Sequence, residues 1–124
     1  MYKNKKIDIF KLANELGFDV RGANLKDECN GIILIDEEQA KIDFFNKNRV
    51  ILYNCRKNIN IKCATISVLI LEYLNQKEFL NKRIKYINAN YDTDLQEVLS
   101  RNQIVEKCLE KKLINKKNIK NVLS

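Results

Sequence analysis

The segment from residue 61 to residue 71 constrains the fold most, because on a helix it leaves almost no polar side after Thr65. Asn58 or Asn60 can cap this helix, which we expect to run to about Gln76. A helix that is apolar all round is buried on every side. The rest of the chain must therefore pack around it in layers.

The segments before this helix predict one further helix and several short strands. The helix is expected from Ile9 to Leu16, with Asp8 as its N-cap and Gly17 just after its end. Apolar runs too short for helices of usual length predict strands. These runs are residues 18–20, 32–35, 42–45 and 50–53. Polar turns separate the last three runs, which favours an antiparallel meander.

The segments after the central helix predict more helices. Apolar spacing predicts one helix over residues 77–87, and Thr93 opens a capping box for a long amphipathic helix that reaches Leu113. A short helix is expected from Lys116 to Leu123. The 124 residues therefore predict a single α+β domain. It has an N-terminal helix, a small antiparallel three-stranded sheet, a buried central helix and C-terminal helices.

Composition excludes several kinds of chemistry. The count of histidine is 0, which removes Ser-His-Asp and Cys-His triads and imidazole-ligated zinc. The three glycines are scattered, so no phosphate-binding glycine loop is present. No stretch of ~18 apolar residues predicts a membrane span. The charged first ten residues lack the apolar part of a secretion signal, so we expect a cytoplasmic protein.

Four cysteines stand at positions 29, 55, 63 and 108, and no two of them are spaced as in C-x-x-C. In a cytoplasmic protein we expect reduced thiols. Lys62 and Arg56 adjoin two of the cysteines, but a nucleophilic cysteine also lacks a histidine base here. We therefore expect small apolar core residues, above all at Cys63 and Cys108, which fall on apolar stripes.

Four short motifs follow one another at family-like spacing. They are Leu12-Ala13-Asn14-Glu15-Leu16-Gly17-Phe18-Asp19-Val20, Gly31-Ile32-Ile33-Leu34, Val50-Ile51-Leu52-Tyr53-Asn54 and Ala64-Thr65-Ile66-Ser67-Val68-Leu69-Ile70-Leu71-Glu72. Over roughly residues 7–75 they resemble the ImmA/IrrE family of metallopeptidase domains. In that family the last motif reads Phe-Thr-apolar-Ala-His-Glu-x-x-His and forms the active-site helix.

The resemblance fails at the catalytic motif. The two zinc histidines of the family fall on Val68 and Glu72, and its general-base glutamate falls on Leu69. A zinc hydrolase needs two imidazoles one helical turn apart and a carboxylate. The resemblance therefore implies a pseudopeptidase without zinc or another cofactor, with Val68 and Leu69 buried as core. Glu72 either reaches water at the helix end or lies in a closed cleft.

The charge of +7 is distributed in blocks. Residues 27–43 carry a net charge of −5, whereas residues 44–71 carry five bases and no acid. Residues 101–124 carry seven bases against two acids. Such blocks are either solvated faces or surfaces for phosphates or acidic proteins. Because their run holds no acid, we expect four residues to contact a partner: Lys47, Arg49, Arg56 and Lys57.

Two functions remain open. The resemblance implies a phage or mobile-element protein, and first a non-catalytic protein-binding module. One version is an inhibitor of a bacterial defence system, of anti-CRISPR type, whose partner is a bacterial protein or ribonucleoprotein complex. The alternative is a basic nucleic-acid-binding protein or regulator of a mobile element, with tyrosines for stacking. Those tyrosines are Tyr53, Tyr73, Tyr86 and Tyr91.

Overall fold

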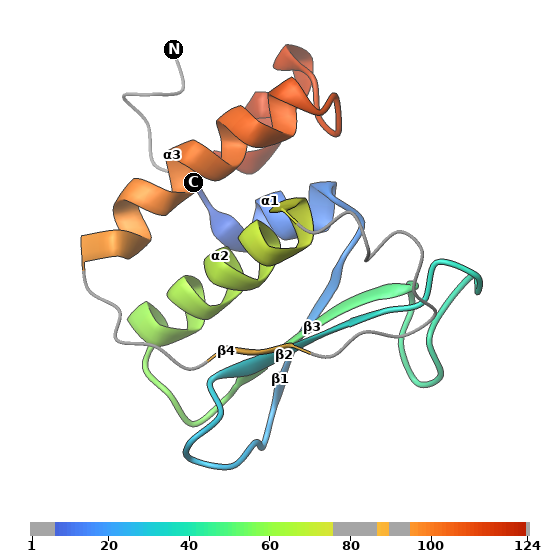
Figure 1. Cartoon of the computed structure of the whole chain (residues 1–124), viewed down its shortest axis with the longest axis vertical. Coiled ribbons are helices and arrows are strands. Elements are labelled where there is room, and N and C mark those ends of the chain that lie inside the picture. The colour runs from blue at the N-terminus through green and yellow to red at the C-terminus, as the bar shows by residue number, and fades with distance from the viewer. Residues whose placement is uncertain (1–6, 76–86, 90–94, 124) are drawn as a thin grey trace.

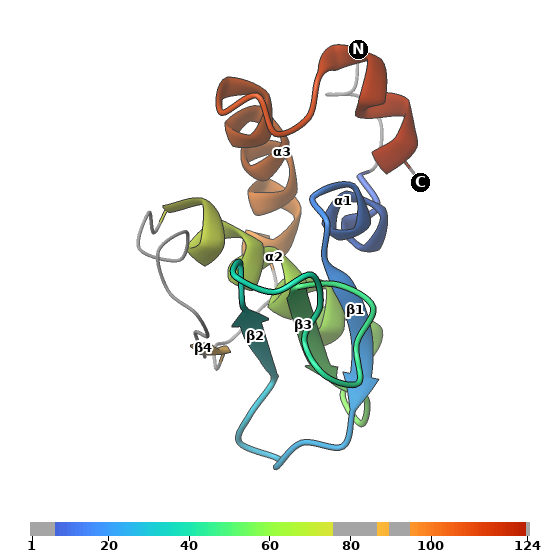
Figure 2. The same cartoon turned by 90° about the vertical axis from the view of Figure 1, so that its right-hand side faces the viewer.

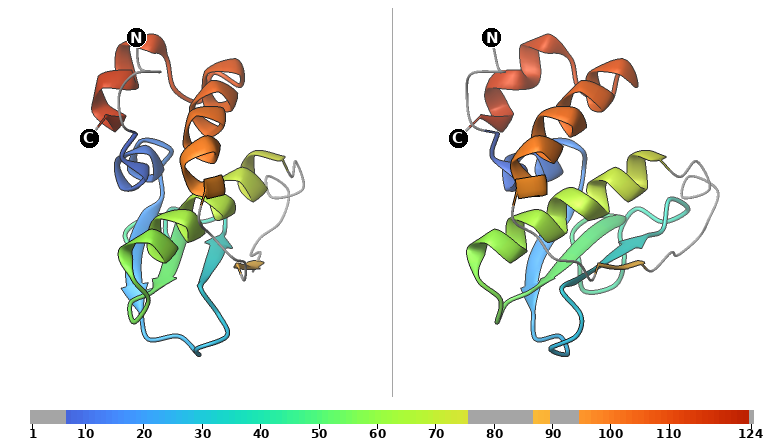
Figure 3. Two further views of the ribbon diagram at one scale, coloured as in Figure 1. Left: turned by 90° about the vertical axis from the view of Figure 1, so that its left-hand side faces the viewer. Right: turned by 60° about the vertical axis from the view of Figure 1, so that its left-hand side comes forward.

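A computed structural model describes residues 7–75, 87–89 and 95–123 and confirms the α+β class (Figure 1). The central helix α2 lies across one face of the sheet, and α3 lies on the side of α2 that faces away from the sheet (Figures 1 and 3). Helix α1 packs against α2, and the 3-10 helix η3 packs against α1. The elements are α1 (Ile9–Glu15), β1 (Asp19–Ala23), β2 (Gly31–Ile35), β3 (Arg49–Asn54), α2 (Ile59–Asn75), β4 (Ile87–Ala89), α3 (Leu95–Glu110) and η3 (Lys116–Val122).

The sheet is mixed and has four strands, in the order β1-β3-β2-β4. Strands β2 and β3 pair antiparallel, as the meander requires, with Ile33 opposite Ile51. The run at residues 18–20 contributes to β1, which pairs parallel with β3, and β4 pairs antiparallel with β2. The expectation of a purely antiparallel three-stranded sheet is therefore wrong in these details, because the sequence pattern does not specify which distant strands become neighbours.

The run at residues 42–45 forms no strand. It belongs to a folded connection between β2 and β3, here called loop 36–48, which stands beside β1 and β3 (Figure 2). Phe44 has a φ of 70°, and this left-handed backbone cannot continue a strand. The two adjacent aromatic rings also have different surroundings. Phe45 packs beneath the guanidinium of Arg21, whereas Phe44 is exposed. The sequence pattern counted both as strand residues.

Helix α1 has the predicted ends. The carboxylate of Asp8 accepts hydrogen bonds from the backbone N–H groups of Phe10 at 3.0 Å and Lys11 at 3.2 Å, and so caps the helix. Gly17 follows the helix with a φ of 87°, the left-handed conformation that ends many helices. Between these ends, α1 buries Ile9, Leu12 and Ala13 in the core.

Helix α2 buries eight of its residues between Ala64 and Leu74, but Val68 and Leu71 are only half-buried, so the prediction of a helix buried on every side is confirmed only in part. Two polar side chains inside it are satisfied locally: Thr65 Oγ1 donates to Ile61 O at 2.7 Å, and Ser67 Oγ donates to Cys63 O at 2.9 Å. The helix lies very close to the sheet at Gly31, where a Cβ atom would come 2.3 Å from Thr65 Cγ2. Only glycine therefore fits at the start of β2.

The C-terminal part is helical where the structure describes it. Helix α3 ends at Glu110, three residues before the predicted end, and η3 is a 3-10 helix. Ile87 begins strand β4 and is not helical, while residues 77–86 and the capping box at Thr93 lie outside the described residues. No helix within the described residues has the length and apolar character needed to cross a membrane.

Candidate functional site

Val68, Leu69 and Glu72 on α2 stand at the positions of the ImmA/IrrE catalytic motif, and only one of the three is fully buried. Leu69 is 0% exposed and packs above Gly31, so its predicted burial is confirmed. Val68 is only half-buried, so that prediction is wrong for Val68, which lies about 100° around the helix from Leu69. Glu72 is half-buried, three residues before α2 ends at Asn75. Alkyl side chains at the first two positions can neither ligate a metal nor accept a proton.

In the described part of the chain, acidic and cysteine side chains elsewhere in the fold do not form a ligand set either. Among residues 7–75, 87–89 and 95–123, no three of them come together as ligands for a metal ion. The described cysteines are free thiols. Cys108 is buried, and burial raises the pKa of its thiol to about 12, whereas Cys55 is exposed, contrary to the expectation that it is a core residue.

The four basic residues expected to bind a partner lie in two separate pairs at opposite ends of β3. Lys47 and Arg49 lie at the start of β3, whereas Arg56 and Lys57 follow its end. A strand of six residues separates the two pairs, which corresponds to about 20 Å. The structure therefore brings these residues together in pairs only.

Arg49 joins three parts of the fold. Its Nε donates to Glu37 Oε1 at 2.8 Å, and its Nη1 donates to Leu16 O at 2.8 Å, at the end of α1. Its guanidinium lies over the ring of Tyr73 on α2, 5.4 Å from the ring centroid. Burial lowers the pKa of Arg49, but the bond to Glu37 and the charges of Tyr73 and Glu37 outweigh it and raise the pKa overall. Glu37 thus neutralises the charge of Arg49.

The other three basic residues also make contacts within the chain. Lys47 Nζ donates to Asn14 Oδ1 at 2.9 Å. Arg56 forms an ion pair with Asp27 at 2.9 Å, and Lys57 Nζ donates to Asp27 O at 2.7 Å. The interpretation that no acid neutralises this run is therefore wrong, because pairing of the strands brings Glu37 and Asp27 to it. A role of these residues in partner binding stays a prediction.

Asn54 organises the connection between β1 and β2 and was not singled out as a site residue. Its side chain is 0% exposed, and its Nδ2 donates to Lys26 O at 3.1 Å and to Cys29 O at 3.0 Å. Its Oδ1 accepts from the backbone N–H of Arg56 at 3.1 Å. A strand that ends in asparagine is the only sequence signal for this role, which is structural.

Two of the four tyrosines considered for stacking are used in packing. Tyr53 meets Phe10 edge to face with ring centroids 5.7 Å apart, and Lys62 Nζ lies 5.6 Å from the Tyr53 centroid. Tyr73 is buried against Phe18 at 5.2 Å. Burial raises the pKa of Tyr73, although Arg49 opposes the shift. Tyr73 is therefore not available as a platform for bases, whereas Tyr53 is half-buried, and residues 86 and 91 lie outside the described residues.

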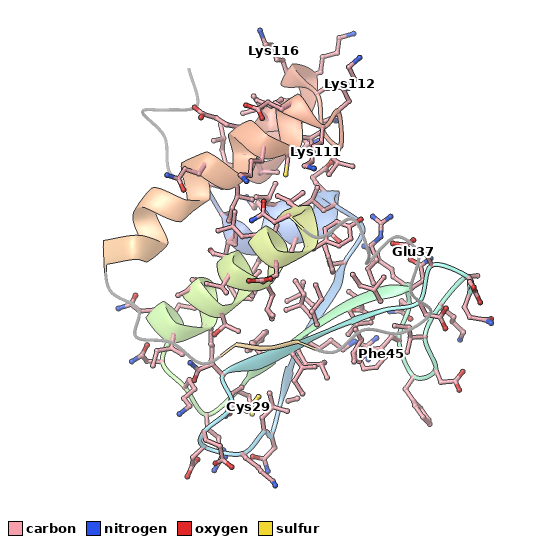
Figure 4. All side chains as sticks on the ribbon, in the orientation of Figure 1. Cys29, Glu37, Phe45, Lys111, Lys112 and Lys116 are labelled. Carbon is pink, nitrogen blue, oxygen red and sulfur yellow. The ribbon has the colours of Figure 1, made fainter. Side chains whose placement is uncertain are left out.

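Loop 36–48 presents a feature that the sequence did not reveal. Phe44 is 92% exposed, and its backbone carbonyl accepts a hydrogen bond from Arg21 Nη1 at 3.2 Å. The guanidinium of Arg21 also lies 5.2 Å from the ring centroid of Phe45, which Figure 4 labels on this loop. The loop therefore holds one aromatic ring against the protein and the adjacent ring in solvent.

Asp19 on β1 fixes the same loop. Its carboxylate accepts from the backbone N–H of Asn46 at 2.9 Å and pairs with Arg21 at 3.0 Å. Burial raises the pKa of Asp19, but the Asn46 N–H and the Arg21 guanidinium, with Lys47, outweigh it and hold the pKa below its usual 3.8. The tether depends on the ionised carboxylate.

The second positive block in the sequence forms an exposed surface. We name it the C-terminal lysine surface, and it comprises Lys111, Lys112, Lys116, Lys117 and Lys120. Figure 4 shows the three that it labels on the turn between α3 and η3 and at the start of η3, remote from the sheet. Within the described part of the chain, none of the five ammonium groups makes an ion pair or a side-chain hydrogen bond.

No protein-family model, curated protein or solved structure matches this chain. The likeness to ImmA/IrrE peptidases therefore rests on the four motifs alone.

Proposed function

We propose that this chain is a non-catalytic module that binds a partner protein, with Phe44 as the apolar anchor of the contact. The proposal rests on Phe44. This side chain is 92% exposed, although its backbone has a φ of 70° and its carbonyl accepts a hydrogen bond from Arg21. Aromatic side chains that fill a pocket of the partner dominate the energy of many protein interfaces.

Folding alone does not account for Phe44. A bulky residue with left-handed backbone costs about 1–3 kcal/mol, which glycine would avoid. An exposed ring offsets none of this cost. The loop is also fixed before any binding, through Asp19, Arg21 and the packed ring of Phe45. Such preorganisation lowers the entropic cost of association.

The wider proposal follows from the resemblance and from the residues at the catalytic positions. Leu69 and Val68 supply no metal ligand and no base, so we assign the chain no enzymatic activity. A phage or mobile-element protein of this kind would act in the bacterial cytoplasm, as an inhibitor of a defence system of anti-CRISPR type. It would cover a surface that a bacterial protein or ribonucleoprotein complex needs.

The test compares Phe44→Gly with Ile59→Ser, since Ile59 is another apolar residue that is 61% exposed. Tagged chains are expressed in bacterial cells, treated with nuclease and purified with their partners. We expect a protein that accompanies the parent and Ile59→Ser but is lost with Phe44→Gly. Urea denaturation should show Phe44→Gly to be at least as stable as the parent. A partner retained by a stable Phe44→Gly contradicts the proposal.

A further inference from the structure

The C-terminal lysine surface is held on a rigid base. Ile114 and Val122, which flank its η3 lysines, are 5% and 0% exposed. Asn115 and Asn118 form a reciprocal capping box at the start of η3. The far end is fixed where the backbone N–H of Asp8 donates to Val122 O at 2.7 Å. The lysines therefore project from a fixed scaffold.

One of these lysines occupies a backbone position that favours glycine. Lys112, the second residue after α3, has a φ of 58°. The Leu113 N–H donates to Cys108 O at 3.0 Å, and the Lys112 N–H donates to Leu109 O at 3.1 Å, the pattern in which glycine usually ends a helix. An exposed lysine adds strain there and makes no ion pair or side-chain hydrogen bond within the described chain. As with Phe44, this favours a use of the side chain outside the fold.

The chemistry of the surface favours phosphate over protein carboxylate. All five cations are lysines, which are compact point charges suited to single phosphate oxygens. Protein interfaces are depleted in lysine and enriched in arginine and aromatic residues. Single strands need aromatic platforms for their bases, but residues 111–123, which hold these lysines, contain no aromatic side chain. A duplex backbone needs only the cations.

We propose that the C-terminal lysine surface binds the phosphate backbone of a duplex nucleic acid without reading its sequence. This proposal stands independently of the Phe44 contact, since the two surfaces share no residue. A chain with both surfaces would suit a partner that contains protein and nucleic acid.

The experiment measures fluorescence anisotropy of the full chain with labelled duplexes of about 20 base pairs, one of DNA and one of RNA, across a salt series. The logarithm of the affinity should fall linearly with the logarithm of the salt concentration, with a slope that reaches about −4.5 if five phosphates are neutralised. DNA and RNA duplexes should bind within a few-fold of each other, because both present phosphates. A clear preference for one duplex would contradict recognition of the phosphate backbone alone.

Two matched double variants test the location. Lys116→Glu/Lys117→Glu should weaken binding at least about tenfold and reduce the slope by about 2. Lys26→Glu/Lys41→Glu removes the same charge from two exposed lysines elsewhere and should change the affinity less than about threefold. Lys112→Gly should weaken binding slightly while the chain stays as stable as the parent.

Three further outcomes would overturn the proposal. The first is an affinity that does not depend on salt, and the second is an equal loss in both double variants, which would reflect net charge alone. The third would assign the surface to an acidic protein. In that case poly-glutamate competes as well as the duplex does, and Leu113→Ser, which alters an apolar side chain that is 43% exposed among the lysines, abolishes binding.

Discussion

The basic residues around β3 and the lysines at the C-terminus belong to sequence blocks of equal net charge, +5 each, yet they have different surroundings in the fold. Around β3, Glu37 pairs with Arg49 and Asp27 pairs with Arg56. The C-terminal lysine surface has no such partner among the described residues. A positive block therefore becomes a free surface only where the fold brings no acid to it.

The reason lies in the pairing of β2 with β3. The acidic block spans the connections on both sides of β2, and antiparallel pairing sets Ile35 opposite Arg49 and Gly31 opposite Tyr53. Acids that follow β2 thus meet bases at the start of β3, and acids that precede β2 meet bases after its end. Helix α3 packs against α2 and η3 packs against α1, so strand pairing brings no acids to the C-terminal lysine surface.

The largest effect on stability is expected on α2. Val68→His with Leu69→Glu should lower the free energy of unfolding by at least about 3 kcal/mol, because a buried leucine is lost and a carboxylate is buried without a partner. Urea denaturation measures the loss, and Leu69→Met serves as the control because it conserves volume. A double variant as stable as the parent would mean that this face of α2 is open to water.

The next effect distinguishes the two basic regions directly. Arg49→Glu should lower the free energy of unfolding by about 2–3 kcal/mol, since it leaves Leu16 O without its donor and sets two carboxylates side by side. Arg49→Lys should fall between this variant and the parent, because lysine lacks the planar fork. If urea titration shows no loss for Arg49→Glu, the β3 bases are as free as the C-terminal lysines.

Much of the fold follows from local patterns. Asp8 and Gly17 mark the two ends of α1, and the apolar surroundings of Leu69 predict the burial of α2. These features depend on neighbours within a few residues. The parallel pairing of β1 with β3 and the place of β4 depend on distant segments, so the sequence pattern did not specify them.

The candidate surfaces were harder to predict for the same reason. The blocks of charge were visible, but which block stays free depends on the acids that strand pairing delivers. By its sequence pattern Phe44 counts as a strand residue. Its left-handed backbone belongs to a loop that Arg21 and Asp19 on β1 hold, and these residues are distant in sequence. Lys112 likewise stands where the usual glycine signal for a helix end is missing.

A smaller effect on stability is expected from acid, and it concerns the contact between Asp19 and loop 36–48. The folded pKa of Asp19 is below its usual 3.8, so its tether contributes stability above about pH 4 and loses it as pH falls through the folded value. Stability measured by urea titration at several pH values should fall less steeply in Asp19→Asn. Asp43→Asn removes an exposed carboxylate from the same loop and serves as the control. Equal slopes in all three chains would show that Asp19 does not hold loop 36–48.

The smallest effect on stability is expected at the C-terminal lysine surface. Lys116→Glu/Lys117→Glu should change the free energy of unfolding by less than about 0.5 kcal/mol, because surface substitutions away from specific contacts seldom do more. Lys112→Gly should keep or slightly raise stability, since glycine accepts a φ of 58° without strain. Urea denaturation of these variants beside Arg49→Glu measures the contrast between the two regions. A loss near 2 kcal/mol from reversing the two lysines would show that the fold uses them as it uses Arg49.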